Sequence, residues 1–266
     1  MVSQIVITSP DKESTVVIDD GELVSYSFFG EELIHQKGDR GWRNADTEMF
    51  PIIGPTEANN FRVQTDRGEA IQDQHGLLRE LDYKVLTTAS SSAEFSKSYK
   101  KNSKVKNSKF PEKSTEASLS WPYDFHFKKS FQLDDKSLLV SFEVDAEKGM
   151  PYMLGYHPAF KLSGNNTESL LVKGSGISLQ DVLDVGSIAY KVLNTDEIVL
   201  NKPDGADLHL STEGFHNFML WTEVSSMLCI EPITAYPYTG SDSLAPELFL
   251  EPNKVSHFKI NIRPNK

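Results

Sequence analysis

Apolar and polar residues alternate along much of this chain. Apolar side chains fall on odd positions in 125–133 and on even positions in 138–144, and Phe258, Ile260 and Ile262 alternate with polar residues near the end. A period of two is typical of strands with one buried face. We therefore predict strands over these three segments, with a turn at 134–137.

The first thirty residues continue the pattern. Segments 4–8, 15–18 and 23–29 have strand character, and Asp19-Asp20-Gly21 is a turn signal. No window keeps an i, i+3, i+4, i+7 apolar pattern for three turns, whereas thirteen prolines and sixteen glycines interrupt the chain. Many short strands favour an all-β sandwich or barrel. No repeat or shift in composition marks a boundary, so we expect one domain over residues 1–266.

Composition narrows the function classes. The hydrophobic fraction of 38% suits a globular protein, and the net charge of −11 argues against nucleic-acid binding, since phosphate backbones select basic surfaces. No secretory signal is visible, and no apolar run reaches the ~20 residues of a membrane helix. Cys229 is the single cysteine, which excludes an intrachain disulfide. We expect a soluble cytoplasmic protein with no membrane partner.

Segment 97–113 holds seven lysines in an otherwise acidic chain. A solvated hairpin end or mobile loop is the favoured interpretation. The alternative is a patch that attracts a phosphorylated substrate or an acidic partner.

A carboxylate stands out within the apolar stretch 227–233. Strand alternation places Leu228 and Ile230 on one face and Cys229 and Glu231 on the other. Pro232 cannot donate a ladder hydrogen bond, so we expect it to end or bulge the strand there. A partly desolvated Glu231 would be a stronger base, although an isolated Glu-Pro pair is more commonly a surface glutamate.

Two histidine stretches accompany it. His157 shares a strand face with Ala159 beside Gly155, where a ligand could approach, and His75 lies in a polar, glycine-flanked stretch. A buried structural role is the simpler interpretation of any single histidine. The seven histidines never form His-x-His or His-Glu-x-x-His, and no cysteine pair exists, so we expect no metal.

Five stretches of the chain resemble the aldose 1-epimerase (galactose mutarotase-like) family, and within it the mutarotase-related bacterial branch. They occur in the same order as in the family. The resemblance runs from about Glu31 to the C-terminus, through the stretches Met49–Gly54, Gln74–Arg79, Trp121–Phe125, Gly155–Phe160 and Leu220–Trp221 with Cys229–Pro232. It implies a large antiparallel β-sandwich, the galactose mutarotase-like supersandwich, whose concave sheet binds a monosaccharide.

The resemblance also implies an activity, that of an aldose 1-epimerase type isomerase acting on a hexose or hexose phosphate. His157 matches the family's general acid, Glu231 its general base, and His75 a sugar-contacting histidine. Arg79 and Gln74 are further substrate-binding candidates. No cofactor is consumed, and we expect a monomer or homodimer.

Two departures leave the substrate open. Pro55 stands where the family commonly has arginine, so Arg79, Arg40 or Arg62 would have to substitute, and Arg79 is preferred. The sugar-binding aspartate of the galactose mutarotases has no recognisable counterpart. A non-catalytic carbohydrate-binding or sensing protein on the same fold is the alternative function. A scaffold whose segment 97–113 docks an acidic partner is the third.

Overall fold

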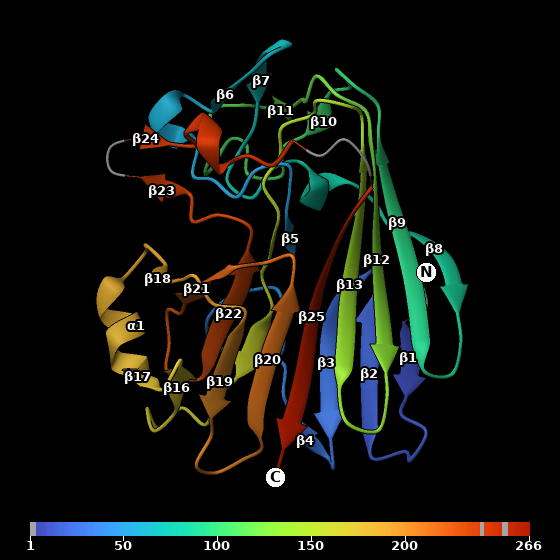
Figure 1. The fold of residues 1–266 in the computed structure, drawn as a ribbon, viewed down its shortest axis with the longest axis vertical. Helices are drawn as coiled ribbons and strands as arrows, with labels where there is room; N and C mark the ends of the chain where they lie inside the picture. Colours follow the sequence, from blue (N-terminus) through green and yellow to red (C-terminus); the bar gives the residue numbers. More distant parts are fainter. Residues whose placement is uncertain (1–3, 240–241, 252–254) are drawn as a thin grey trace.

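The computed structural model describes residues 4–239, 242–251 and 255–266. Every pairing between its strands is antiparallel. The largest sheet has nine strands, in the order β17 (Ser175–Ser178), β16 (Ser169–Val172), β19 (Glu197–Asn201), β20 (Asp207–Glu213), β25 (Ser256–Asn265), β13 (Leu138–Ala146), β12 (Phe125–Leu133), β9 (Ser92–Tyr99) and β8 (Lys84–Thr88). Figure 1 shows β25, β13, β12 and β9 running side by side through the middle of the molecule.

Two smaller sheets complete the framework. One contains β1 (Ile5–Thr8), β2 (Ser14–Asp19), β3 (Glu22–Phe28) and β4 (Glu31–Glu32). The other runs β18 (Tyr190–Leu193), β21 (Asn217–Trp221), β22 (Met227–Ile233), β14 (Gly155–Tyr156) and β5 (Glu48–Met49), with β15 (Ala159–Lys161) also paired to β22. Three two-stranded ribbons join β6 (Arg62–Thr65) to β7 (Gly68–Ile71), β10 (Val105–Lys106) to β11 (Ser118–Leu119), and β23 (Tyr238–Thr239) to β24 (Asp242–Ser243).

Helical structure is sparse. The described residues contain α1 (Leu179–Val185) and three 3₁₀ turns, η1 (Glu57–Asn59), η2 (Leu78–Glu80) and η3 (Pro246–Leu248). Ser178 and Asp181 form a capping box at the start of α1, which is too short to show the three-turn pattern sought in the sequence. None of these helices is long and apolar enough to cross a membrane. The predicted all-β class is confirmed.

The predicted hairpins form where the alternation places them. In β12 and β13 the apolar residues face one another in register, with Phe131 opposite Val140, and Asp134 accepts main-chain hydrogen bonds that close the turn. Between β2 and β3 both Asp20 and Gly21 have positive φ, as the tight two-residue turn requires.

Aromatic contacts join the sheets face to face. The Phe142 ring of β13 lies 5.1 Å from that of Tyr156 of β14, and Phe50, just after β5, lies 4.9 Å from Phe125 of β12. These side chains belong to one large core cluster shared by the three main sheets. The six-stranded sheet is therefore fixed with one face on this core, which leaves its opposite face for a site.

Candidate active site

Strand β22 carries Glu231 on the face away from the main core. Leu228 and Ile230 belong to the large core, whereas Cys229 packs in a separate small cluster with Ala159 and Met227. The predicted division of faces is therefore confirmed. Glu231 is only 1% exposed, so it is not a surface glutamate.

The prediction that Pro232 ends or bulges this strand is wrong. β22 continues to Ile233, and Pro232 lies in register opposite Phe218 of β21. On the other side of β22 the ladder is interrupted, since β15 pairs only as far as Cys229 and β14 pairs at Ile233. The proline therefore stands beside a gap in which its missing N–H loses no ladder hydrogen bond.

His157 occupies that gap. Gly155 pairs with Ile233 and Ala159 pairs with Cys229, so the same register sets His157 directly across from Glu231. Cross-strand neighbours on one face are close enough for their side chains to touch. The His157 Nε2 and Glu231 Oε1 atoms are 3.3 Å apart. Strand register brings the two residues together.

The main chain of His157 is held on its other side by Thr47. The His157 N–H donates to the Thr47 carbonyl at 2.9 Å, and the Thr47 N–H donates back to the His157 carbonyl at 3.3 Å. His157 thus lies between two neighbouring strand segments, which fixes the position of its ring.

Both members of the pair are shifted toward their uncharged forms. Burial lowers the pKa of His157 to about 3, with the Arg79 charge adding to the effect, and burial raises the pKa of Glu231 well above its usual value. The imidazole is therefore neutral at physiological pH, and the close contact is not an ion pair in this state. The Nδ1 atom of His157 is buried with no hydrogen-bond partner among the described residues.

His75 faces this pair from a tight turn. Its ring lies edge-on to that of His157, with centroids 5.4 Å apart, and its Nδ1 is 3.1 Å from the Ile53 carbonyl oxygen. His75 and Gly76 both have positive φ, and a Cβ on Gly76 would come within 2.3 Å of the Phe50 carbonyl oxygen. Only glycine fits there. Burial, followed by the charges of nearby residues, lowers the pKa of His75 well below its usual value.

Arg79, on η2, is the best placed of the three substitute arginines. Its charge lowers the pKa of both His75 and His157. Arg62 instead pairs with Glu69 and Glu116, and Arg40 is exposed. The side chain of Gln74 is exposed, and the hydrogen bonds of Gln74 with Asp73 and Lys109 are made by its main chain. The structure thus groups His157, Glu231 and His75, with Arg79 nearby and Gln74 outside the group.

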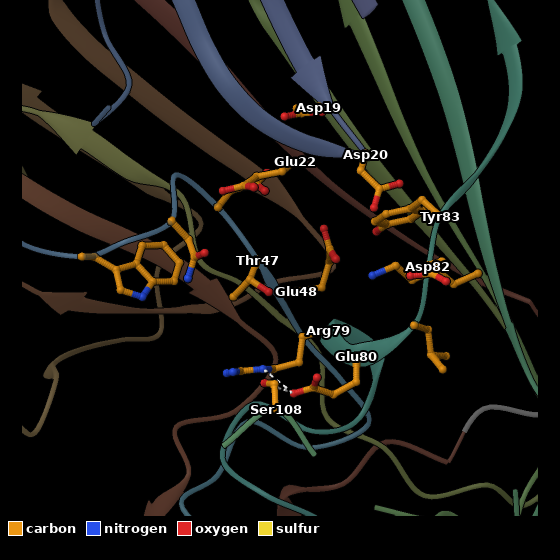
Figure 2. Close-up of a pocket in the computed structure, with 16 residues that line it drawn as sticks. Asp19, Asp20, Glu22, Thr47, Glu48, Arg79, Glu80, Asp82, Tyr83 and Ser108 are labelled. Carbon is orange, nitrogen blue, oxygen red and sulfur yellow. Dashed lines mark hydrogen bonds and ion pairs between the residues drawn. The ribbon is translucent and has the colours of Figure 1, made fainter. Parts of the chain in front are cut away.

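A cavity of about 370 Å³ adjoins this group, and its lining includes Trp42, Thr47 and Arg79. Figure 2 shows acidic side chains around it, and the Arg79 guanidinium is bonded to Glu80 with Nε 3.3 Å from the carboxylate oxygen. Seven carboxylates line the cavity, against the two cations Arg79 and Lys97: Asp19, Asp20, Glu22, Asp46, Glu48, Glu80 and Asp82.

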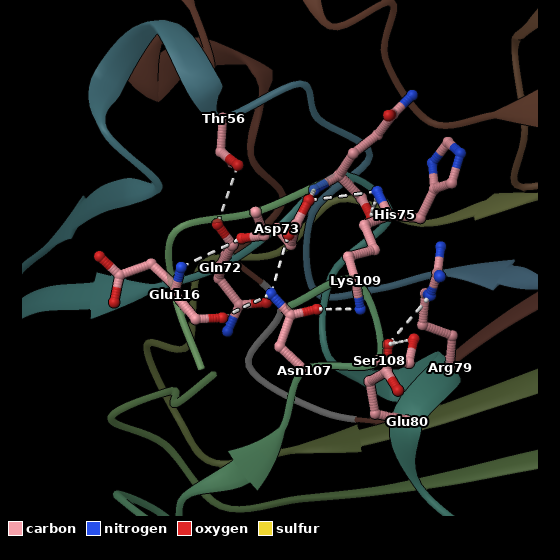
Figure 3. A network of polar contacts seen from close by, with 12 residues as sticks. Thr56, Gln72, Asp73, His75, Arg79, Glu80, Asn107, Ser108, Lys109 and Glu116 are labelled. Carbon is pink, nitrogen blue, oxygen red and sulfur yellow. Dashed lines mark hydrogen bonds and ion pairs between the residues drawn. The ribbon is translucent and has the colours of Figure 1, made fainter. Parts of the chain in front are cut away.

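The lysine-rich segment 97–113 is not uniformly solvated. Lys97 is buried in β9 and donates to the Leu78 carbonyl at 3.0 Å, while Lys109 lies 3.1 Å from Asp73 (Figure 3). The prediction of a solvated hairpin or mobile loop is wrong for these two lysines. It describes better the exposed ones, Lys100, Lys101, Lys104, Lys106 and Lys113.

Sequence reasoning missed one residue beside the pair. The Trp42 indole stacks on the imidazole of His157, with centroids 4.4 Å apart and planes inclined by 30°. Trp42 lies in a loop without periodicity, so no sequence pattern marked it. Trp221, which lies in one of the five family-like stretches, has its ring centroid 6.1 Å from that of His157. The described residues hold no group of three or more His, Cys, Asp or Glu suited to a metal ion.

Residues 63–188 match the family model described as aldose 1-epimerase. Over these residues, just under half of the chain, the sequence is similar to this family. His75, Arg79 and His157 lie inside the matched range, and Glu231 lies beyond it. The family is the one that the five sequence stretches indicate.

Solved structures share the galactose mutarotase-like fold over nearly the whole chain. A galactose mutarotase-like protein from Lactobacillus casei ATCC 334 has a TM-score of 0.79 at 18% identity, covering 99% of this chain and 100% of that one. A galactose mutarotase related enzyme from Lactobacillus acidophilus has a TM-score of 0.78 at 18% identity, covering 99% and 98%. Protein LacX of Lactococcus lactis subsp. lactis is 22% identical over 247 residues, covering 76% of this chain and 78% of LacX.

Proposed function

We propose that this protein is an aldose 1-epimerase that interconverts the α and β anomers of a neutral hexose, in a single domain spanning residues 1–266. The observation that carries the proposal is the buried contact of 3.3 Å between His157 Nε2 and Glu231 Oε1, with the ring of His75 alongside. The match of residues 63–188 to the family model and the names of the similar proteins support the reaction class.

The reaction needs an acid and a base close together. O1 and O5 of a cyclic aldose are bonded to the same carbon, so two groups in contact with each other can reach both oxygens. Glu231 takes the proton from the O1 hydroxyl, and His157 gives a proton to O5 as the C1–O5 bond breaks. Rotation about C1–C2 and reclosure with the proton transfers reversed give the other anomer, and both residues return to their starting states.

The pair must first rearrange one proton. In the buried state the pKa directions place the ionisable proton on Glu231 and leave His157 neutral. Moving this proton across the 3.3 Å contact yields the carboxylate base and the imidazolium acid without gain or loss of a proton. Sugar hydroxyls around the pair favour this charged arrangement, because they replace an apolar surrounding with polar groups.

The electrostatics favour a neutral sugar over a sugar phosphate. Carboxylates dominate the lining of the adjoining cavity, and the guanidinium of Arg79 is already bonded to Glu80. The carboxylates would repel a phosphate group, and the phosphate would have to compete with Glu80 for the guanidinium of Arg79. The acidic net charge of −11 acts in the same direction.

A screen for anomer exchange tests the proposal. NMR saturation transfer between the α and β anomers, run on neutral hexoses and on their 6-phosphates, should show acceleration by the wild-type protein and a higher rate constant for a neutral hexose. Acceleration of phosphates alone would overturn the substrate class. Sugar binding without acceleration of any sugar would instead support the non-catalytic binding protein.

A further inference from the structure

The His157–Glu231 pair is closed off from solvent. His157 is 5% exposed and Glu231 is 1% exposed, and no sugar can contact atoms that water scarcely reaches. The indole of Trp42 covers the face of the imidazole at a centroid distance of 4.4 Å. In this state the ring of Trp42 occupies space beside the pair that a substrate needs.

Trp42 also borders the adjoining cavity. It lines the space of about 370 Å³, whereas neither His157 nor Glu231 does. A volume of this size falls within the range of small-molecule sites. Trp42 therefore separates a cavity large enough for a monosaccharide from the pair that would act on it.

Few contacts hold the indole in place. The hydrogen bonds to Met227 and His35 hold the main chain of Trp42 and not its indole: the backbone N–H donates to the Met227 sulfur, a weak acceptor, at 3.2 Å, and the backbone carbonyl oxygen lies 2.8 Å from the His35 ring nitrogen. The indole packs on the small cluster of Ala159, Met227 and Cys229, which is separate from the main core. Moving it would therefore leave the main core intact.

The neighbouring backbone is adapted to this closed position. Gly41 has a φ of +115°, and a Cβ there would lie 2.7 Å from the Met227 sulfur. The side chains of Arg40, Arg43 and Asn44 on the same loop are exposed. Near its tip the loop therefore contacts the protein through Gly41 and Trp42, and further along the Ala45 N–H donates to Glu22 at 2.8 Å.

We propose that Trp42 is a gate between the cavity and the His157–Glu231 pair, and that substrate reaches the pair only when the indole leaves the face of His157. The nature of the substrate rests on the proposed function, but the gate does not. Because sugar and closed indole compete for the same space, the closed state reduces the apparent affinity for sugar by the fraction of molecules that are open.

Cys229 provides a reporter of opening that is independent of catalysis. It is the only cysteine in the chain, it is fully buried, and it belongs to the cluster on which Trp42 packs. Opening of the gate should therefore admit a small thiol reagent to its sulfur.

The test compares the rate of Cys229 modification by methyl methanethiosulfonate, followed by mass spectrometry, in three variants and the wild type. Trp42→Ala should react on the order of tenfold faster than wild type, since local opening limits access. Trp42→Phe should be intermediate, and Arg43→Ala, which alters only an exposed side chain of the same loop, should match wild type. Equal rates in the wild type and both Trp42 variants would overturn the gate, and thermal unfolding of each variant shows that the fold persists.

Kinetics provide the second readout. If Trp42 competes with sugar, Trp42→Ala should lower KM several-fold, because the variant has no closed state that sugar binding must displace. A rise in KM would mean that the indole binds the sugar, and would overturn the gate. If the wild type accelerates no sugar, the proposed function fails while the thiol experiment still decides on the gate.

Discussion

Two groups of ionisable side chains are buried on either side of Thr47, and they are accommodated in opposite ways. Lys129 is fully buried and contacts Asp46 at 2.7 Å and Glu48 at 2.6 Å. The second group is the pair of His157 and Glu231. The main chain of His157 is hydrogen-bonded to Thr47, and its side chain contacts that of Glu231 in β22.

The lysine of the first group keeps its charge, although burial raises the pKa of its partner Asp46 to about 6. Burial opposes the charge on Lys129, but the two carboxylates outweigh burial and raise the pKa of the amine. Tyr156 adds a hydrogen bond to Asp46 at 2.7 Å. The second group has no such counter-charge, and burial drives both members toward their uncharged forms.

The difference separates a structural cluster from a reactive one. A buried charge with matched partners fixes neighbouring chain segments. Its removal leaves the partner charges buried and uncompensated, which destabilises the folded state. A buried pair with shifted pKa values and no counter-ion can change its protonation, which is what acid–base chemistry requires. The comparison predicts different consequences for substitutions in the two groups.

The largest effect on stability should follow Lys129→Met. Two buried carboxylates would lose their cation, which should lower the free energy of unfolding by about 3–5 kcal/mol. Urea denaturation measures the loss. Lys128→Met, on the adjacent, partly exposed position of β12, is the matched control and should cost less than about 1 kcal/mol. Equal losses in both variants would contradict the structural role.

Glu231→Gln should act in the opposite direction. The folded-state pKa of Glu231 is raised, so the wild type loses stability as pH rises from the unfolded value of 4.5 toward the raised value. The variant should become more stable relative to wild type, by up to about 1.4 kcal/mol per pH unit in that window. Urea denaturation at pH 5, 6 and 7 measures the slope. Glu213→Gln, at an exposed position, is the matched control, and a flat difference for Glu231→Gln would refute the raised pKa.

Arg79→Met should produce the smallest change. Removing its positive charge should raise the pKa of both His75 and His157, since that charge lowers them now. NMR titration of the imidazole ring protons reports both values. Arg62→Met, whose side chain pairs with Glu69 and Glu116, should leave them unchanged. Unchanged histidine pKa values in Arg79→Met would show that Arg79 does not act on the site.

Alternation in the sequence predicted many of the strands and the face of β22 that carries Glu231, but not the residue that faces Glu231. It set the faces of β22 correctly, with Glu231 on the face opposite Leu228 and Ile230. It could not place His157 across from Glu231, because that depends on pairing between segments more than seventy residues apart.

Other features depend on partners that local patterns do not reveal. Lys129 falls on an odd, core-facing position of β12, and only Asp46 and Glu48, far away in the chain, make its burial possible. Pro232 continues its strand because the facing ladder has a gap. Lys97 was grouped with solvated lysines, but β9 directs it inward.

The central claim is that His157 and Glu231 perform the proton transfers of anomer exchange. The most direct measurement is the exchange rate of the best neutral hexose, by NMR saturation transfer, in Glu231→Gln and His157→Asn, with Glu213→Gln and His257→Asn as exposed controls. We predict that each site variant loses about 10²–10⁴-fold of the acceleration while the controls keep it. Site variants that remain folded and as active as the controls would contradict the account.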